Sequence, residues 1–558
     1  MATAKNNIAR EQVRELKEAP LPLPGVVLQL RTGKKQAFGP TQSAINKLQV
    51  EGSIFAGKTG LDGDEHVYKH HGGIDRAIHQ YNPDHYADWR AEEPPAPALF
   101  DIGGFGENLT TTNMNEENVC VGDLYRLGEE IILQVSEPRN PCYKLNIRFQ
   151  WPRVLKRVQR TGRVGWNFRV LQTGYVKKGD TISLLERPHP KWSVMNVQRA
   201  IKGKAVPLSL VEECSELEVL TSKFRDMALH RLRSSPKRYA VTKIEQVTPR
   251  VKQLTFSLLD TLKLSNSDFE DFAFAQLRFG PDLSLSRSYS IVSGNMKTFC
   301  LGVALDDQSR GGSAYLHQQL RVGDEVQMVP GDSPKAVADE KSCEKDGSIA
   351  HRLIIIGDIG VTAFLPKIKS WQQQGVPLSI HYAVRSDADA AYANDLPKQP
   401  TTTYSKTRNE RLEVESIIPP PSSKTKLYCC GPARLMQACK QLTDKLGYPE
   451  NMVHFEDFTA PRGDDLGDPF EVEVDEPDTK RKETLVVPSD KTLLQVLHEA
   501  GFDNVMSSCE TGGCGACKVT LCAGKVAYNS QVLSEEEKKT AMQSCVDRGV
   551  GKIKIEID

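Results

Sequence analysis

The sequence of 558 residues lacks several features that would assign it to a common class at once. It has no excess of one charge, because 72 Lys and Arg residues balance 72 Asp and Glu residues, and this argues against a nucleic-acid partner. It has no apolar run long enough to cross a membrane, so we expect no membrane partner. The first twenty residues contain no apolar stretch and do not resemble a signal or transit peptide.

Regularly spaced cysteine pairs are scarce as well. The thirteen cysteines mostly stand alone, apart from Cys429–Cys430 and a group near the C-terminus. This distribution does not suggest a disulfide framework and is typical of a reducing compartment, so we predict a cytoplasmic protein. The chain is too long for a single hydrophobic core, which predicts three or four domains.

The most informative stretch is SSCETGGCGACK, residues 507–518. It has the C-x4-C-x2-C spacing of a plant-type [2Fe–2S] cluster, and a fourth cysteine follows near the C-terminus. Small residues between the cysteines let the loop wrap tightly and bring backbone N–H groups to the sulfurs. Four cysteines also bind zinc, although zinc loops usually contain two C-x2-C pairs and this one contains a single pair. The predicted iron ligands are Cys509, Cys514, Cys517 and Cys545.

Histidines gather in residues 61–89, which hold five of the twelve in the chain. Such density indicates a polar pocket or a metal site, but the spacing fits no standard zinc pattern, and a histidine-rich surface loop is the alternative. Gly72–Gly73 predicts a tight turn, and residues 77–89 predict a short helix.

Cys142 follows a predicted strand that ends in SEPRN. Arg139, Asn140 and Pro141 would hold this thiol in a fixed, electropositive turn, which favours the thiolate. By itself, a single cysteine is more often an inert small residue of the core.

Three segments in order, DGDEHVYKHHGGIDRAIHQY, FGENLTT and SEPRNPCYKL, resemble the MOSC domain of molybdenum cofactor sulfurases, and in particular its YiiM-type branch. The resemblance covers about residues 20–187. It implies a β-barrel that holds a molybdenum–pterin cofactor, with the Cys142 thiolate as the metal ligand and catalytic residue, and a soft thiolate suits this metal. The residues expected around the pterin and its phosphate are His71, Gly72, Asn108 and Arg139.

Residues 188–237 predict three short helices and a polar linker. Val194, Val197 and Ile201 recur at helical spacing, and Pro207 precedes the second helix. This region resembles the small helical segment that follows the barrel in YiiM-type proteins.

A second all-β unit is predicted over residues 238–340. Its segment RSYSIVSG would offer the guanidinium of Arg287 and the flat ring of Tyr289 to a ligand. The later Gly311, Gly312 and Ser313 stand at a predicted helix start, where backbone donors and a hydroxyl could bind phosphate. Each motif alone could equally be an ordinary strand or an ordinary helix cap.

Alternating strands and helices follow over residues 341–460. Leu353–Ile356 predicts a buried parallel strand, a glycine-containing turn comes next, and residues 363–374 predict a helix. The later KLYCCGPARL repeats this strand–turn–helix pattern, which predicts a doubly wound sheet with ligands at the strand ends. The turn is not the G-x-G-x-x-G fingerprint, so the pattern alone leaves a dinucleotide site open.

The motif order RSYS, RGGS, GDIGVT, CCGP and cysteine loop resembles the phthalate dioxygenase reductase branch of the ferredoxin–NADP reductase superfamily, over about residues 238–558. The resemblance implies a flavin barrel, an NAD(P) domain and a ferredoxin domain, with FMN preferred over FAD by branch membership. By match, the flavin residues are Arg287, Tyr289, Ser290, Gly312 and Ser313, and the nicotinamide nucleotide residues are Gly357, Gly360, Thr362 and Cys430.

Two departures from that branch concern the nucleotide turn. Asp358 stands where the family usually has glycine, and no proline follows Thr362. Since a carboxylate beside a pyrophosphate is unfavourable, the choice between NADH and NADPH stays open.

We therefore predict a multidomain α+β and α/β protein that is a self-contained, molybdenum-dependent oxidoreductase. Electrons would pass from NAD(P)H to flavin, to the [2Fe–2S] cluster and to Mo–pterin, and reduce N-hydroxylated small molecules such as hydroxylaminopurines or amidoximes. The alternatives are a reductase for a separate oxygenase and a non-catalytic carrier of the molybdenum cofactor.

The sequence determines no oligomeric state, and no motif suggests pyridoxal phosphate. The predicted domains are 1–187 (MOSC), 188–237 (three helices and linker), 238–340 (flavin), 341–460 (NAD(P)) and 461–558 (linker and ferredoxin).

Overall fold

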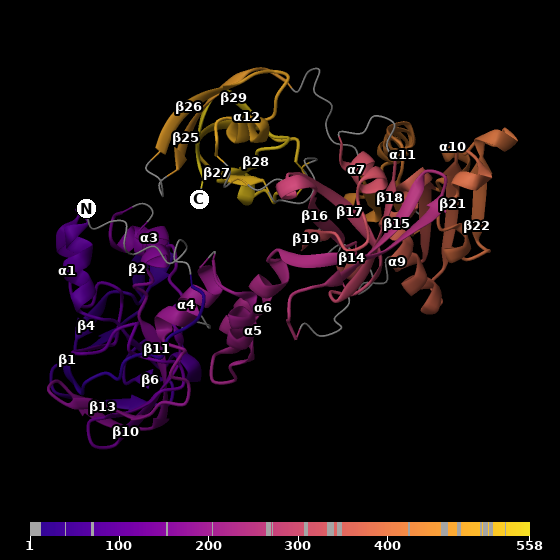
Figure 1. The fold of residues 1–558 in the computed structure, drawn as a ribbon. Coiled ribbons are helices and arrows are strands. Elements are labelled where there is room, and N and C mark those ends of the chain that lie inside the picture. The colour runs from indigo at the N-terminus through magenta and orange to yellow at the C-terminus, as the bar shows by residue number, and fades with distance from the viewer. Residues whose placement is uncertain are drawn as a thin grey trace. The chain divides into compact units, whose positions relative to one another are not determined.

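The computed structural model divides the chain into two compact units, Met1–Ser235 and Pro236–Asp558, and each is described by itself (Figure 1). The structure describes residues 13–39, 41–67, 72–151, 154–203, 205–263, 269, 272–305, 311–331, 340–342, 349–421, 424–458, 467–476, 481–502, 505, 512, 517–530 and 532–557.

A closed sheet of eight strands forms the centre of the first unit. Closure comes from β1, which also pairs with β13 and sets Gly25 opposite Ile182. The interior is apolar because inward-facing residues of β10 and β11, such as Leu133, Val135 and Phe168, are almost fully buried. The strands in sheet order are β13 (Thr181–Glu186), β9 (Leu124–Leu127), β10 (Ile131–Pro138), β11 (Trp166–Gln172), β7 (Ile78–Gln80), β8 (Leu109–Thr111), β1 (Gly25–Gly33) and β4 (Lys47–Gln49).

Shorter elements surround this barrel. The predicted helix over residues 77–89 is wrong in its first half, because Ile78 pairs with Phe168 in the sheet and the helix begins only at Asp84, after Pro83. Burial explains the difference, since Ile78 and Gln80 are enclosed as sheet residues. The shorter elements are β2 (Gln36–Phe38), β3 (Thr41–Ser43), β5 (Ser53–Gly57), β6 (Gly60–Leu61), β12 (Gly174–Lys177), α1 (Asp84–Ala91), α2 (Lys144–Arg148) and α3 (Val154–Thr161).

Three helices follow the barrel, as the sequence predicts: α4 (Val194–Lys202), α5 (Leu208–Glu216) and α6 (Ser222–Ser234). Ser193 caps α4 by accepting a hydrogen bond from the Asn196 backbone N–H at 3.1 Å. The barrel is tied to α6 through the fully buried Glu137 of β10, whose carboxylate accepts a hydrogen bond from the Thr221 hydroxyl at 2.6 Å.

The second unit begins with a closed antiparallel barrel of six strands. Its core holds aromatic and aliphatic residues such as Tyr239, Phe256 and Phe299. A short helix, α7 (Gly312–Gln318), starts where the sequence predicts it. The strands in barrel order are β14 (Lys237–Thr248), β15 (Val251–Leu258), β18 (Thr298–Ala304), β17 (Leu285–Gly294), β16 (Phe274–Phe279) and β19 (Glu325–Gly331).

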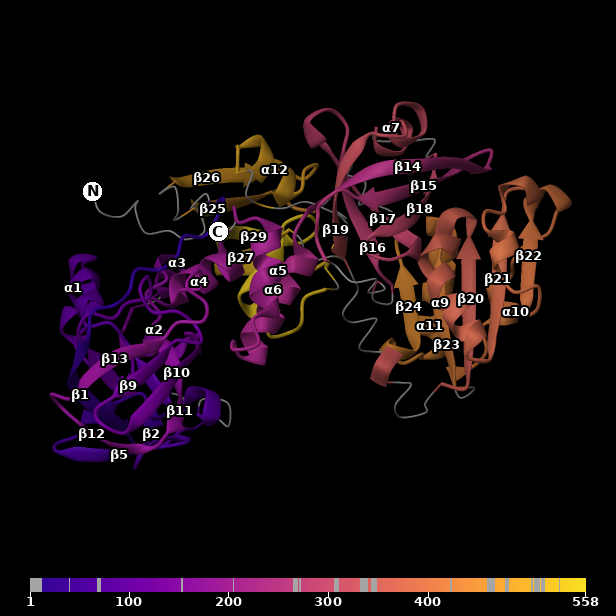
Figure 2. The same ribbon diagram turned by 60° about the horizontal axis from the view of Figure 1, so that its bottom comes forward.

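A parallel sheet of five strands comes next, and Figure 2 shows its strands side by side. Alternate residues of β20 enter different cores: Ile354 and Ile356 pack with α9, whereas Leu353 and Ile355 pack with residues of α10 and α11. Helices therefore cover both faces, which is the predicted doubly wound arrangement. The elements are β22 (Thr401–Ser405), β21 (Leu378–Val384), β20 (His351–Gly357), β23 (Thr425–Cys430) and β24 (Val453–Glu456) in sheet order, with α9 (Val361–Gln373), α10 (Val414–Ile417) and α11 (Ala433–Leu446).

The C-terminal sheet is mixed, because β25 pairs parallel with β29 while the other pairs are antiparallel. A helix with a capping box formed by Thr492 and Gln495 packs its buried leucines into the same core. The elements are β26 (Arg481–Val487), β25 (Phe470–Glu476), β29 (Arg548–Glu556), β27 (Lys518–Ala527) and β28 (Ala541–Gln543) in sheet order, and α12 (Leu493–Glu499).

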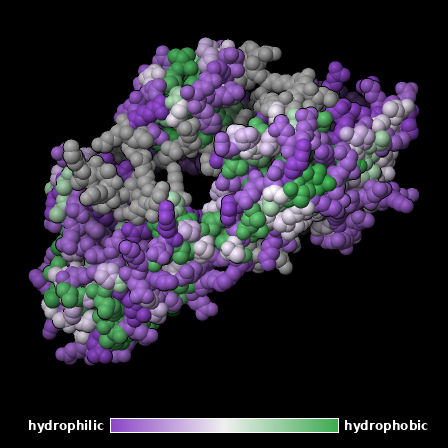
Figure 3. All heavy atoms as spheres, viewed as in Figure 1, coloured by the Kyte–Doolittle hydropathy of each residue, from purple (hydrophilic) through white to green (hydrophobic). Residues whose placement is uncertain are grey.

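Hydrophilic residues cover most of the face in Figure 3, and apolar residues form small separate patches between them. No helix in the described part of the chain combines the length and hydrophobicity needed to span a bilayer.

The first prediction concerns Glu137, which also accepts hydrogen bonds from Arg76 (2.5 Å) and Asn167 (3.0 Å). Glu137→Ala leaves a mostly buried guanidinium without this carboxylate, which costs about 3 kcal/mol, and should lower the melting temperature of the first unit by roughly 6–12 °C. The control is Glu117→Ala, which removes a half-exposed carboxylate from Arg199 and should shift melting by less than about 4 °C. Equal shifts in calorimetry of the two full-length variants would contradict the assigned role.

Candidate functional site

Cys142 lies between β10 and α2 and is partly exposed. Hydrogen bonds fix the backbone on both sides of it. The Arg139 N–H donates to the Gly165 carbonyl at 2.9 Å, and the Cys142 carbonyl accepts from the Leu145 N–H at 3.1 Å. The thiol is therefore held by a short, defined turn, as predicted.

Polar atoms without hydrogen-bond partners are enclosed near this turn. They are Nη1 of Arg139, Oε2 of Glu107 and Nε of Arg148. Burial lowers the pKa of the Arg139 guanidinium, and Cys142 and Glu107 are among the groups that oppose this shift, so each of them lies within electrostatic reach of Arg139. Enclosed polar atoms without partners are rare in native proteins and indicate a missing ligand or water.

Asn108, another predicted pterin residue, is buried in a hydrogen-bond network that joins two strands and a loop. Its side-chain amide donates to the Arg31 carbonyl at 3.1 Å and to the Asp64 carboxylate at 2.8 Å. Asp64 also pairs with the buried ammonium of Lys47. The Arg31 guanidinium passes so close to Gly103 that a Cβ there would lie 2.6 Å from it. The absence of a side chain at Gly103 therefore leaves space for the Arg31 guanidinium.

The charges of this cluster do not cancel. Arg31, Lys47, Arg139 and Arg148 supply four cations, while Asp64 and Glu107 supply two carboxyl groups. Burial raises the pKa of the Glu107 carboxyl and lowers the pKa values of Lys47, Arg139 and Arg148. The excess of positive charge and the unpartnered donors suit an anionic ligand rich in hydrogen-bonding groups, as a pterin with a phosphate would be.

The remaining predicted pterin residues are placed less directly. His71 lies outside the described residues. Gly72 packs against His66, because a Cβ on Gly72 would lie 2.4 Å from that ring, and the His66 ring is 3.8 Å from the Asp64 carboxylate. Among the described residues, His66 therefore connects Gly72 to the hydrogen-bond network of Asn108 and Asp64.

The histidine-rich segment divides into separate roles. His85 pairs with the buried Glu116 at 2.7 Å; burial opposes the charged imidazole, but Glu116 prevails and raises the His85 pKa to about 9. Burial lowers the pKa of His79 well below its usual range, and Arg139 lowers it further. In the part of the chain that the structure describes, no group of three or more His, Cys, Asp or Glu residues is arranged as a metal site.

The predicted flavin residues lie on one edge of the six-stranded barrel. Arg287, Tyr289 and Ser290 belong to β17, and α7 begins beside them: a Cβ on Gly312 would lie 2.9 Å from the Arg287 side chain. Tyr289 is partly buried, and this burial raises the pKa of its hydroxyl. The structure brings the glycine-rich turn before Ser313 to the guanidinium, an arrangement that suits a phosphate group beside a flat ring.

The predicted nucleotide residues gather where two turns meet at the carboxyl ends of β20 and β23. A Cβ on Gly360 would lie 2.3 Å from the Cys430 carbonyl, and a Cβ on Gly357 would lie 2.6 Å from Pro432. Both glycines are therefore required by this close approach. Thr362 and Cys430 are buried, and the Thr362 hydroxyl donates to the Ile359 carbonyl at 2.9 Å.

Two of the four predicted cluster ligands are described, and they lie close together. Both Cys517 and Cys545 are buried, and the Ser544 N–H, next to Cys545, donates to the Cys517 carbonyl at 3.1 Å. Cys509 and Cys514 lie outside the described residues. Buried neighbouring thiols on one side of a ferredoxin-like sheet fit the predicted iron site.

Sequence reasoning did not identify Arg31, Lys47, Asp64, Glu107 or Arg148. Arg31 and Lys47 belong to segments without a recognisable motif, and long-range contacts bring them to the Asn108 network. Asp64 and Glu107 carried a usable signal, since they lie in the quoted segments DGDEHVYKHHGGIDRAIHQY and FGENLTT.

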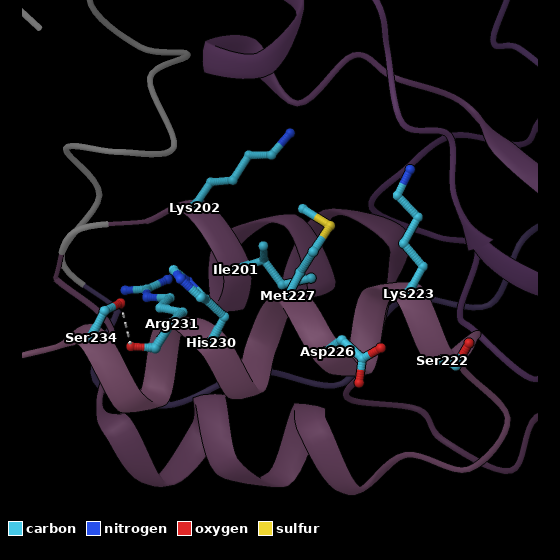
Figure 4. A pocket seen from close by; sticks show the side chains of 9 residues that line it. All are labelled: Ile201, Lys202, Ser222, Lys223, Asp226, Met227, His230, Arg231 and Ser234. Carbon is cyan, nitrogen blue, oxygen red and sulfur yellow. Dashed lines mark hydrogen bonds between the residues drawn. The ribbon is translucent and has the colours of Figure 1, made fainter. Parts of the chain in front are cut away.

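A hollow of about 710 Å³ lies on α4 and α6 (Figure 4). Burial lowers the pKa of its Lys202 to about 8. It holds none of the residues predicted for a cofactor, so we do not count it as a candidate site. Its lining residues are Ile201, Lys202, Ser222, Lys223, Asp226, Met227, His230, Arg231 and Ser234.

Comparison with known proteins agrees with both halves of this description. Residues 67–183 match the MOSC domain, and residues 475–546 match the 2Fe-2S iron-sulfur cluster binding domain. A protein of Gibberella moniliformis named "Reductase" is 53% identical over 559 residues, which cover 99% of each chain. The chain belongs to the family of this reductase.

Two further relatives correspond to parts of the chain. The protein YiiM of Escherichia coli is 44% identical over 158 residues, covering 28% of this chain and 70% of YiiM. The solved phthalate dioxygenase reductase, described as modular, is 23% identical with a TM-score of 0.42, covering 58% of this chain and 98% of that one. The predicted combination of a YiiM-like MOSC domain with a [2Fe–2S] domain in one chain is confirmed, and the full-length relative of this chain is named a reductase.

The second prediction concerns Arg287 of the flavin site. Arg287→Ala removes the guanidinium beside Gly312 and should weaken flavin binding at least about tenfold, because a charge-assisted hydrogen bond is worth about 1.5 kcal/mol or more. Absorbance of the released flavin, identified as FMN or FAD by chromatography, measures this loss. Arg278→Ala changes an exposed arginine of the same barrel and should retain the flavin, so equal loss in both variants would count against Arg287.

Proposed function

We propose that this reductase is a self-contained, molybdenum-dependent enzyme that uses NAD(P)H to reduce N-hydroxylated compounds, such as hydroxylaminopurines or amidoximes. Electrons pass in the order NAD(P)H, flavin (FMN), [2Fe–2S] cluster and Mo–pterin. The observation that carries the proposal is the positively charged cluster of unpartnered polar groups near Cys142, in a chain that also contains a [2Fe–2S] domain.

The residues of the first unit fit the molybdenum cofactor. Cys142 would supply the thiolate ligand, and thiolates suit soft metal centres. Arg139 and Arg148 offer donors that lack partners, while Asn108 is held rigidly by two hydrogen bonds. When bound, the cofactor supplies a two-electron centre that accepts an oxygen atom; the surrounding residues orient it and balance the charge of its phosphate.

The proposed overall reaction is balanced in atoms, protons and electrons. An N-hydroxyl compound takes up two electrons and two protons and gives the amine and water, and one NAD(P)H with one proton supplies both. Glu107, fully buried and with a raised pKa, is a carboxyl group within electrostatic reach of Arg139. In this proposal, Glu107 is the weak acid that would supply a proton to the reaction.

The arrangement of both modules in one chain supports this proposal over the two alternatives. Covalent linkage raises the effective concentration of donor at acceptor, which benefits an enzyme whose two halves exchange electrons. The Gibberella moniliformis reductase matches 99% of this chain, so the linkage occurs in that relative as well. A reductase for a separate oxygenase would have no need of the MOSC domain, and a cofactor carrier would have no need of the reductase module.

The third prediction concerns metal content. The purified chain should contain about two iron atoms and no stoichiometric zinc, because the cysteine spacing is that of a two-iron cluster. Cys545→Ser, which replaces a buried ligand by a poor one, should lower iron to near zero while flavin stays bound. Elemental analysis decides between the cluster and the zinc site, and stoichiometric zinc in place of iron would contradict the electron path.

The fourth prediction tests Cys142 as the molybdenum ligand. Cys142→Ser replaces a soft thiolate by a hard, mostly protonated hydroxyl, so bound molybdenum should fall at least about tenfold by elemental analysis. Reduction of a hydroxylamine or amidoxime should disappear. NAD(P)H-driven reduction of ferricyanide should persist, because the residues proposed to bind the nucleotide, the flavin and the cluster lie in the other unit.

Cys120→Ser provides the control, since Cys120 is a buried cysteine of the same unit whose thiol donates to the Pro190 carbonyl at 3.5 Å. This variant should keep both molybdenum and activity. Wild-type protein without molybdenum but with ferricyanide activity would favour the reductase for a separate oxygenase. Wild-type protein that binds molybdenum cofactor but reduces no N-hydroxylated compound would favour the carrier.

A further inference from the structure

The strand order of the parallel sheet locates where its ligand binds. The chain runs from β20 through β21 to β22 on one side, then returns to place β23 and β24 on the other. In open sheets of this kind, ligands bind at the carboxyl ends of the strands where the order reverses, which here is between β20 and β23. Asp358 is the first residue after β20 and therefore stands at this point.

Asp358 adopts an unfavourable backbone conformation at the end of β20. Its φ of 47° lies in the left-handed region, which glycine adopts freely and aspartate tolerates. The buried Tyr382 donates a hydrogen bond to the Asp358 carbonyl at 3.1 Å, and the preceding Gly357 is packed against Pro432. The turn is thus held from both sides, so the position of its carboxylate is set by the fold.

Arg385 follows the end of β21 and faces this carboxylate. Its Nε lies 3.7 Å from Oδ2 of Asp358. In doubly wound folds, the end of the second strand lies near the adenosine ribose, where an arginine accommodates the 2′-phosphate of NADP. Burial raises the pKa of Asp358 and Asp389 raises it further, whereas Arg385 and Arg250 lower it. One guanidinium at this edge therefore already has a carboxylate partner.

We propose that Asp358 makes the enzyme select NADH over NADPH, by engaging Arg385 in an ion pair and by placing a negative charge near the 2′-phosphate. This inference rests on the nucleotide site of the proposed function but not on its molybdenum site. NADH brings a neutral ribose hydroxyl to Arg385. NADPH brings a 2′-phosphate to a position where Arg385 already pairs with the Asp358 carboxylate. The pair is half-exposed, so its effect on coenzyme choice is moderate.

The test is Asp358→Asn, which removes the charge and keeps the shape of the side chain. With ferricyanide as acceptor, the ratio of kcat/KM for NADPH to that for NADH should rise about fivefold over the wild type, mainly through a lower KM for NADPH. Affinity for 2′,5′-ADP, measured by calorimetry against 5′-AMP, should rise by a similar factor. Asp358→Gly, which also relieves the positive φ, provides a second variant and should shift the ratio in the same direction.

Two further variants make the assignment specific. Asp387→Asn removes a carboxylate from the same strand end, but one that pairs with Arg408, and should leave the ratio within about twofold of the wild type. In the Asp358→Asn background, Arg385→Gln should abolish the gain, because the two residues form one coupled pair.

A wild type that prefers NADPH, or unchanged ratios and affinities in both Asp358 variants, would overturn the proposal. If the flavin-loaded wild type reduces ferricyanide with neither nucleotide, the nucleotide site of the proposed function itself is wrong. Loss of N-hydroxylamine reduction alone, with ferricyanide activity intact, leaves this test unaffected.

Discussion

Compensation of buried charge is the constraint on which much of this structure depends. In the first unit, Glu137 is fully enclosed and joins a guanidinium, an amide and a hydroxyl from different elements. In the parallel-sheet domain, Glu340 does the same with Arg352 (3.0 Å) and Lys426 (3.0 Å). Such carboxylates cannot stay buried without their partners, so the elements that carry them must assemble together.

The cluster beside Cys142 departs from this rule, and the departure indicates function. Four cations face two carboxyl groups, and enclosed donors on Arg139 and Arg148 lack partners. The gathering of several unpartnered polar atoms in one cluster is what the proposed ligand would explain. In the second unit, the carboxylate of Asp358 lies 3.7 Å from Arg385, and both side chains are partly exposed.

Local patterns predicted the elements, and distant contacts decided the sites. The apolar run of β20 and the stripe Val194, Val197 and Ile201 are periodic within one segment, so their strand and helix could be predicted. The first part of residues 77–89 could not, because Ile78 becomes a strand only by pairing with Phe168 of β11. Asn108 was predicted from a motif, but its partners Arg31 and Asp64 lie 77 and 44 residues away, and the motifs do not predict these hydrogen bonds.

The bridge from Glu137 to Thr221 also determines where this chain can be divided. Thr221 precedes α6, so a fragment that ends with the barrel strands near Glu186 would keep the buried carboxylate of Glu137 and lose one of its donors. A fragment that ends at Ser235 keeps both sides of the bridge. The three helices are therefore part of the folding unit of the barrel, and the exchange of this module between proteins would have to carry them along.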